Sequence, residues 1–262
     1  MAAPAPLLDI VFAILSVVLL VFLVGPVLAV LLADPHAAFV LSWSDSELLA
    51  AIAVSIGCAL VAVMLGAMLG VPLAYLLERN EFRGKRFAMA VLSLPLVIPH
   101  PVAGIALLML FAKNRLLGSI LEGHLGIAVV SAAPGIILAM LFVSAPLVVR
   151  GAQQGFRRED ARLERVAQSL GASRLESFRS IALPLARPAI VAAMVSAMAR
   201  AASEFGSIAV LAYFPRTAPV LIWDRFTAYG LSAALPATAF LLVVTLVLFW
   251  GWTLTDRGPH DA

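Results

Sequence analysis

Two charged residues inside an apolar stretch are the pair in this sequence most suited to chemistry. Arg200 and Glu204 lie four residues apart in MARAASEFGSIAVLAYFP, so they share one face of a helix. A charge near the centre of a bilayer costs roughly 2.5–3.5 kcal/mol on insertion scales, and such side chains therefore face protein or water. We expect Arg200 and Glu204 to interact, either lining a transport path or fixing helix packing. Gly206 would permit a bend or a close helix contact beside them.

A histidine lies in a second apolar stretch that is rich in proline. His100 stands in LSLPLVIPHPVAGIALLML, close to Pro95, Pro99 and Pro101. These prolines remove backbone donors and predict a broken helix, whose freed carbonyls must meet water or neighbouring protein. Broken helices at membrane depth often border substrate cavities. His100 could titrate or donate to an anion, or it could simply bond to a neighbouring backbone.

We find no motif in the sequence whose residue types and spacing would form a catalytic or cofactor site. The only Gly-Lys pair, Gly84-Lys85, lacks the upstream glycine and the following Ser or Thr of a phosphate-binding loop. We find no nucleophile–base constellation and no metal-ligand cluster, and the single cysteine, Cys58, excludes an intrachain disulfide. We therefore expect this chain to be no enzyme and to hold no cofactor. Any ATP hydrolysis would belong to another subunit.

Composition identifies the solvent of this chain as lipid. It has 262 residues, of which 63% are hydrophobic and 13% charged, and its mean hydropathy is +1.04. Apolar runs long enough to cross a bilayer recur along it. We predict an all-α polytopic membrane protein with six spans, at about 7–32, 48–77, 87–112, 127–149, 189–213 and 233–254. Gly66 and Gly70, four residues apart, predict close helix packing.

The loops between these spans differ in their content of Lys and Arg. Loop 78–86, the segment 150–188 and the C-terminal tail together hold thirteen such residues, and the loops on the opposite side hold four. The positive-inside rule then places both termini and the segment 150–188 in the cytoplasm. The net charge of +3 follows this topology and needs no nucleic-acid partner.

The segment DARLERVAQSLGASRLESFRSIALPLARP, from Asp160 to Pro188, is basic and helix-forming. Leu163, Val166, Ala167 and Leu170 recur at helical spacing and form one apolar stripe. Gly171 ends this helix, because glycine adopts the left-handed cap conformation at no steric cost.

A second short helix follows in the same segment. Ser173 and Glu176 have the spacing of a capping box. Pro184 and Pro188 are expected to stop this helix before the next span. A hairpin that merely links two spans is the alternative to a partner-binding element.

The order Ala167, three residues, Gly171, nine residues, Ile181, one residue, Leu183-Pro184 resembles the cytoplasmic coupling loop of ABC importer permeases. That family's loop usually begins with Glu-Ala-Ala, whereas this chain has Arg165-Val166-Ala167 and a glutamate one place earlier, at Glu164. The departure leaves open which side chain makes an acidic contact to the ATPase.

Among ABC importer permeases, the chain most resembles the permease of a molybdate/tungstate importer, and further segments carry this resemblance. It covers about residues 48–250, and the segments that carry it are 98–108, 134–146, 162–167, 203–206 and 218–226. The resemblance implies a type I ABC importer permease fold in the prokaryotic plasma (inner) membrane. Residues 1–47 would be a peripheral helix with its outward loop, 48–254 the transmembrane core with the coupling loop at about 150–188, and 255–262 a cytoplasmic tail.

The resemblance also implies partners and site residues. The partners would be a second copy of the chain, two cytoplasmic ATPase subunits that bind ATP and Mg²⁺, and an extracytoplasmic oxyanion-binding protein. The ATPase-coupling residues would be Leu163, Glu164, Arg165, Val166, Ala167, Leu170, Gly171, Leu183 and Pro184. The translocation path would include His100, Arg200, Ser203, Glu204, Phe205 and Gly206.

Two other functions are compatible with parts of this pattern. A permease for sulfate, thiosulfate or another small solute would share the same loop. An ion-coupled secondary carrier would work without an ATPase and usually shows an inverted repeat, which this sequence lacks.

Overall fold

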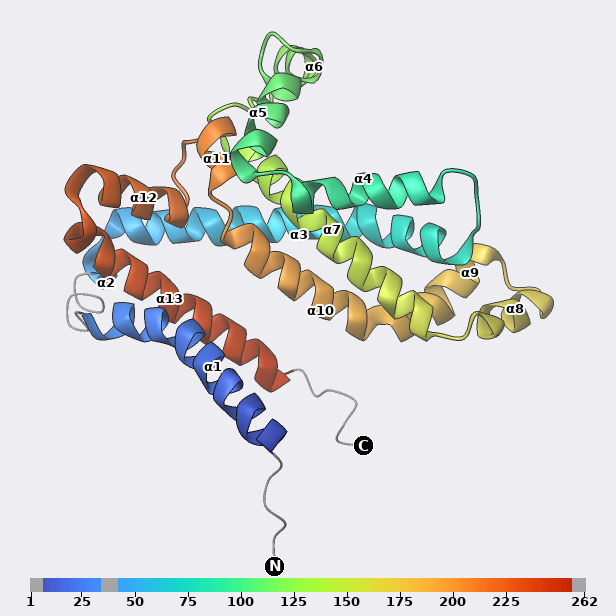
Figure 1. The fold of residues 1–262 in the computed structure, drawn as a ribbon. Helices are drawn as coiled ribbons and strands as arrows, with labels where there is room; N and C mark the ends of the chain where they lie inside the picture. The colour runs from blue at the N-terminus through green and yellow to red at the C-terminus, as the bar shows by residue number, and fades with distance from the viewer. Residues whose placement is uncertain (1–6, 34–41, 256–262) are drawn as a thin grey trace, which may run out of the picture. The chain divides into compact units, whose positions relative to one another are not determined.

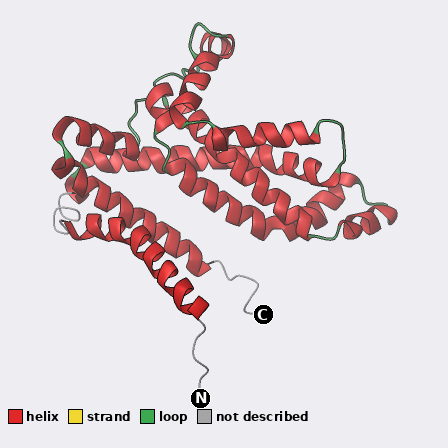
Figure 2. Ribbon diagram, viewed as in Figure 1, coloured by secondary structure: helices red, strands yellow, loops and turns green. Residues whose placement is uncertain are grey.

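The computed structural model describes residues 7–33 and 42–255, and the side chains of 8–33 and 42–247. All regular elements in this part of the chain are helices (Figure 2). By its internal contacts the chain divides into a terminal unit, residues 1–50 and 221–262, and a central unit, residues 51–220. Apart from residue 255, the predicted tail at 255–262 lies outside the described residues.

The terminal unit contains the first and last helices of the chain. Its elements are α1 (Leu7–Ala33), α2 (Ser42–Ser44), the start of α3 (Ser46–Arg79), most of α12 (Ala218–Tyr229) and α13 (Leu231–Thr255). Helix α1 contacts α13 but is otherwise exposed along its length (Figure 1). In α2, the Trp43 ring packs edge-on against Phe240 of α13, with 5.5 Å between ring centroids.

An ion-pair cluster joins α12 to the start of α3 inside the terminal unit. The Arg225 guanidinium donates to the carboxylates of Asp45 and Glu47. The hydrogen bond from Arg225 holds the pKa of Asp45 below its ordinary value. The charged groups of Asp45, Glu47 and Arg225 are therefore paired with one another within the chain.

The central unit is a bundle in which α7 and α10 pack along each other (Figure 1). Its elements are the rest of α3, α4 (Lys85–Val97), α5 (His100–Phe111), α6 (Leu116–Leu125), α7 (Ala133–Arg158), α8 (Ala161–Ser169), α9 (Arg174–Ser177), the π-helical turn η2 (Phe178–Ala182), α10 (Leu183–Ala202) and α11 (Gly206–Leu211).

Small residues allow the helices of the central unit to approach closely. A Cβ atom at Gly151 of α7 would lie 2.1 Å from the Cβ of Ala193 on α10. A Cβ at Gly70 of α3 would lie 2.9 Å from a Val149 methyl group on α7. Such close approach supplies the van der Waals contact that drives helix association in lipid. The prediction that Gly66 and Gly70 serve packing is confirmed, since Gly66 also faces α7.

Two of the predicted spans are broken. Helices α4 and α5 are separated at Ile98-Pro99 and bent by 115°, as the prolines predict. The predicted fifth span, 189–213, is interrupted between Ala202 and Gly206, so the bend expected at Gly206 is present.

The number of spans is close to the prediction without matching it. Four helices of the described residues are long and apolar enough to cross a membrane, and the bent pair α4–α5 would make a fifth. Residues 231–247 of α13 form a shorter apolar helix, in the region of the predicted sixth span.

The prediction that Pro184 and Pro188 stop the second hairpin helix is wrong. The helical path continues from Arg174 to Ala202, over 29 residues. Pro184 lies in the first turn of α10, directly after the π-helical turn η2, and Pro188 lies inside α10. A π turn already departs from the regular i→i−4 bonding. A missing proline N–H is therefore tolerated there, and the hairpin is continuous with a membrane helix.

Candidate functional site

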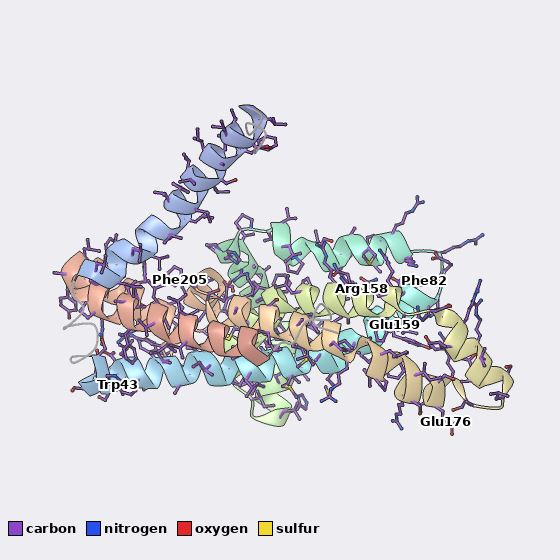
Figure 3. All side chains as sticks on the ribbon, turned by 90° about the horizontal axis from the view of Figure 1, so that it is seen from below. Trp43, Phe82, Arg158, Glu159, Glu176 and Phe205 are labelled. Atoms are coloured by element: carbon purple, nitrogen blue, oxygen red, sulfur yellow. The ribbon has the colours of Figure 1, made fainter. Side chains whose placement is uncertain are left out.

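The hairpin, residues 160–182, has the glycine cap and the capping box that the sequence predicts, and a further cap at Asp160. Asp160 caps α8 by accepting from the backbone N–H of Arg162 at 2.8 Å. Gly171 has φ +101°, in the left-handed region that favours glycine, and separates α8 from α9. Ser173 and Glu176 form the predicted capping box. Figure 3 labels Glu176 on the hairpin. These local bonds define the direction in which α8 presents its side chains.

The outer face of α8 is apolar and basic. Leu163, Val166 and Leu170 are 49%, 57% and 83% exposed. Arg162 and Arg165 are exposed beside them, whereas Ala167 is half-buried. A contiguous exposed apolar stripe is typical of an interaction surface. Three of the four residues of the predicted stripe are therefore exposed, and the fourth, Ala167, is half-buried.

The inner face of α8 is held by a buried carboxylate. Glu164 is only 4% exposed. It accepts a hydrogen bond from the Tyr75 hydroxyl at 2.6 Å and one from Nε of Arg79 at 2.7 Å, both in the last turns of α3. The Tyr75 ring packs edge-on against Phe156 and Phe178. The carboxylate of Glu164 is thus used inside the chain, and it fixes α8 to the end of α3.

Leu183 and Pro184 occupy a different place from the stripe. Leu183 packs against the hydrophobic core, and Pro184 is exposed in the first turn of α10. Both lie where the hairpin passes into the membrane helix.

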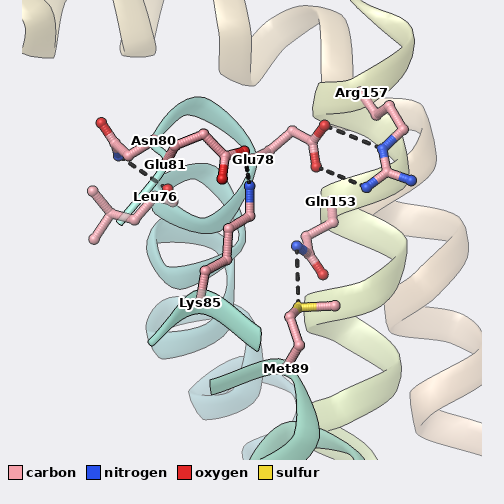
Figure 4. Close-up of polar contacts among 8 residues, drawn as sticks. All are labelled: Leu76, Glu78, Asn80, Glu81, Lys85, Met89, Gln153 and Arg157. Atoms are coloured by element: carbon pink, nitrogen blue, oxygen red, sulfur yellow. Dashed lines mark hydrogen bonds and ion pairs between the residues drawn. The ribbon is translucent and has the colours of Figure 1, made fainter. Parts of the chain in front are cut away.

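The basic segments 78–86 and 150–188 contact each other at the end of the central unit that carries the hairpin. Arg157 of α7 forms a two-bond ion pair with Glu78 of α3, with N–O distances of 3.1 and 3.2 Å (Figure 4). Arg174 of α9 donates to the Asn80 side chain at 2.8 Å. The segments 78–86 and 150–188, assigned to one side by their charge, therefore meet at one end of the central unit.

The two helix breaks bring His100, Arg200 and Glu204 together. Oε2 of Glu204 lies 2.9 Å from Nη2 of Arg200 and 3.2 Å from Nδ1 of His100. The same Nη2 lies 3.0 Å from both ring nitrogens of His100. The predicted contact between Arg200 and Glu204 is confirmed, and His100 joins it. We call these three residues the charged triad.

Glu204 is buried and anchored on its other oxygen. Only 1% of the residue is exposed, and its Oε1 accepts from the backbone N–H of Ser207 at 2.9 Å and from the Ser207 hydroxyl at 2.7 Å. Ser207 therefore positions the carboxylate independently of Arg200. Ser207 was not among the predicted site residues, and its spacing of three residues from Glu204 is the one signal that could have identified it.

Glycine makes the meeting of the two breaks possible. A Cβ at Gly206 would lie 2.7 Å from the Cβ of His100, and one at Gly104 would lie 2.8 Å from the Ser207 carbonyl oxygen. Helices α5 and α11 accordingly pack with no room for a side chain at these points. Ser203 donates to the Arg200 carbonyl, and Phe205 packs partly buried on the core.

Known proteins with similar sequences are transport permeases. The family described as "Binding-protein-dependent transport system inner membrane component" matches residues 66–259. The molybdate/tungstate transport system permease protein WtpB of Thermococcus kodakarensis is 38% identical over 240 residues, covering 91% of this chain and 92% of that protein. WtpB of Pyrococcus abyssi is 42% identical over 186 residues, covering 71% and 69%. A probable sulfate transport system permease protein cysT of Chlorokybus atmophyticus is 36% identical over 202 residues, covering 76% and 70%.

Solved structures agree on the fold. A bacterial ABC transporter involved in the import of the acidic polysaccharide alginate matches with a TM-score of 0.74 and 17% identity, covering 95% of each chain. The MetNI methionine ABC transporter in an inward-facing conformation matches with a TM-score of 0.61 and 17% identity, covering 80% of this chain and 92% of that chain. The chain is therefore a multi-pass membrane protein that belongs to the family of binding-protein-dependent transport system inner membrane components, the permease subunits of ABC importers.

Proposed function

We propose that this chain forms the translocation path of an ATP-driven importer for molybdate or tungstate. Two copies would line the path, and two ATPase subunits, which bind ATP and Mg²⁺, would dock on their hairpins. An extracytoplasmic binding protein would deliver the anion. The relatives named as molybdate/tungstate permeases, at up to 42% identity, support this substrate class.

The construction of α8 is the observation that carries this proposal. Its outer face offers Leu163, Val166 and Leu170 to a partner, while Glu164 ties its inner face to α3. A partner bound to the outer face of α8 could therefore move α3 through the contacts of Glu164 on the inner face. A linker with no partner would leave no reason for three large apolar side chains to face water.

The continuous helical path from Arg174 to Ala202 extends the same argument. It begins in the hairpin and ends beside the charged triad. Because α8 packs on α9 and η2, movement of α8 by an ATPase would reach the helix breaks along this one helical path. This supports coupling of ATP binding to opening of the path.

We also propose that both termini lie in the cytoplasm. The excess of Lys and Arg in segments 78–86 and 150–188, which meet at one end of the central unit, supports this orientation. With Cys58 replaced by serine, a cysteine at Ser180, which is exposed on the hairpin, should react with a membrane-impermeant maleimide only in inverted vesicles. Reaction in intact cells would contradict the orientation.

Reconstitution tests the function directly. Proteoliposomes that contain the chain, its ATPase and its binding protein should accumulate radiolabelled molybdate only when all three and ATP are present. Accumulation by the chain alone would overturn the proposal in favour of a secondary carrier.

Sulfate is the second candidate substrate. The similarity to a probable sulfate permease, at 36% identity, supports sulfate as this second candidate. Competition by unlabelled tungstate and sulfate against molybdate uptake separates the two. Stronger competition by tungstate supports the first assignment, and stronger competition by sulfate supports the second.

A further inference from the structure

The residues of the charged triad differ in how far their side chains are exposed. Its carboxylate is buried, whereas the side chains of Arg200 and His100 are 27% and 45% exposed. A cationic face at membrane depth cannot lie against lipid without a large cost, so it faces water or another protein surface. The accessible side of the triad is thus the side that attracts an anion.

Arg200 also retains hydrogen-bonding capacity. Its contacts to Glu204 and His100 all use Nη2. Among the described residues, no partner engages Nη1 or Nε. Each N–H group that remains on these two nitrogens can donate one charge-assisted hydrogen bond to an oxygen of an anion. His100 can add an N–H donor from its ring.

Glu204 is built to stay in place when Arg200 changes partner. Its Oε1 keeps the two bonds from Ser207, and only Oε2 is shared with Arg200 and His100. An arriving anion would therefore compete with a carboxylate that does not leave. That competition weakens the binding of the anion.

We propose that Arg200 and His100 form a transient binding site for a tetrahedral oxyanion, and that Glu204 limits the affinity of this site so that the anion can leave. The inference rests on the proposed function and adds a substrate-contact site to the path. Transport requires binding that is favourable enough for entry and weak enough for release. The carboxylate of Glu204, fixed behind Arg200 and His100, meets both needs.

The test measures equilibrium binding of radiolabelled molybdate to the assembled permease–ATPase complex without its binding protein. The variant Glu204→Gln keeps the carbonyl that accepts from Ser207 and removes the charge that competes for Arg200. Its affinity for molybdate should rise on the order of tenfold over the wild type, the equivalent of one charged hydrogen bond. The double variant with Arg200→Ala should lose this gain.

An ion pair elsewhere in the central unit supplies the control. Glu78→Gln removes the carboxylate that pairs with Arg157, outside the triad, and should leave molybdate binding unchanged. If Glu204→Gln does not assemble, Glu204→Asp replaces it. The shorter side chain withdraws the carboxylate from Arg200, so a smaller gain in affinity that also depends on Arg200 is expected.

Two results would overturn the site. One is equal molybdate affinity in the wild type and the assembled Glu204 variant, and the other is a gain that survives Arg200→Ala. Because binding is measured without ATP hydrolysis, its outcome is separate from that of the uptake assay. Normal molybdate uptake with no effect of the Glu204 variant on binding rejects the site and leaves the proposed function standing.

Discussion

Glu164 of the hairpin and Glu204 of the helix break are both buried carboxylates, but their cations are placed differently. Glu164 pairs with Arg79, whose side chain is only 13% exposed, and with the buried hydroxyl of Tyr75. Glu204 contacts the Arg200 guanidinium and the His100 ring, whose side chains are partly accessible. An enclosed pair has no alternative partner, whereas an accessible cation can exchange its own. The first contact is therefore a fixed tie, and the second can open.

Removal of the fixed tie should have the largest effect. Glu164→Ala leaves Arg79 and the Tyr75 hydroxyl without their acceptor, and breaking a buried pair in this way costs about 3–5 kcal/mol. We expect a lower melting temperature of the purified complex and loss of coupling between ATP hydrolysis and uptake. Tyr75→Phe, which removes one bond and keeps the ring packing, should have a smaller effect in the same direction.

The exposed pair between Lys85 and Glu81 is the matched control for this change. Glu81→Ala should alter the melting temperature little, because exposed ion pairs contribute at most about 1 kcal/mol. If the Glu164→Ala complex kept its melting temperature and its coupling, the contacts of Glu164 with α3 would be needed for neither stability nor coupling.

Removal of the exchangeable cation should affect transport more than assembly. Arg200→Ala leaves Glu204 buried with Ser207 and His100. The anion would lose a charge-assisted hydrogen bond worth about 1.5–3 kcal/mol, so the rate of uptake should fall by about tenfold or more. The measurement is the initial rate of molybdate uptake at equal complex yield. Full uptake with unchanged yield would remove Arg200 from the path.

Strain at the end of α8 should disturb the hairpin without touching either carboxylate. Gly171→Asp places a side chain at φ +101°, where a non-glycine residue costs roughly 1–2 kcal/mol. We expect ATP hydrolysis to continue while uptake falls. Gly230→Asp, at φ +81° in the terminal unit, imposes similar strain away from the hairpin and should keep hydrolysis and uptake coupled. Equal coupling in the two variants would argue against a specific role of the hairpin.

The smallest effect is expected from a third carboxylate–arginine contact, between Asp45 and Arg225. The bond from Arg225 lowers the pKa of Asp45 below its ordinary 3.8, so the stabilisation is complete above that value and is lost as the pH falls through the lower, folded-state pKa. Because the pair is partly exposed, it should contribute at most about 1 kcal/mol. Melting of Asp45→Asn against pH measures it. An acid-induced loss of stability as large in the variant as in the wild type would contradict this role.

Local contacts of the site were predictable from the sequence, and distant ones were not. The contact between Arg200 and Glu204 and the capping box of Ser173 follow from residues three or four apart. Tyr75 and Arg79 lie 89 and 85 residues from Glu164, and no periodicity identifies such partners. His100 was a candidate by its type, but its place beside Arg200 depends on how two broken helices pack.

The fold shows the same division. Proline predicted the break between α4 and α5, because the missing N–H groups have a local consequence. Proline also led to the wrong prediction that the hairpin helix stops at Pro184. There the π-helical turn η2 takes up the irregularity, and packing of Phe178 and Ala182 on the core keeps the chain helical.

A rod 29 residues long, from Arg174 to Ala202, spans about 40 Å. If one end is tilted by about 10°, simple geometry displaces the other end by about 7 Å. The contact that joins this helix to α5, from Nη2 of Arg200 to Nδ1 of His100, is 3.0 Å long, so a fraction of that swing is enough to separate the two side chains. If an ATPase moves the hairpin end as proposed above, the length of this helix would turn a small angular change there into a displacement of several ångströms beside Arg200.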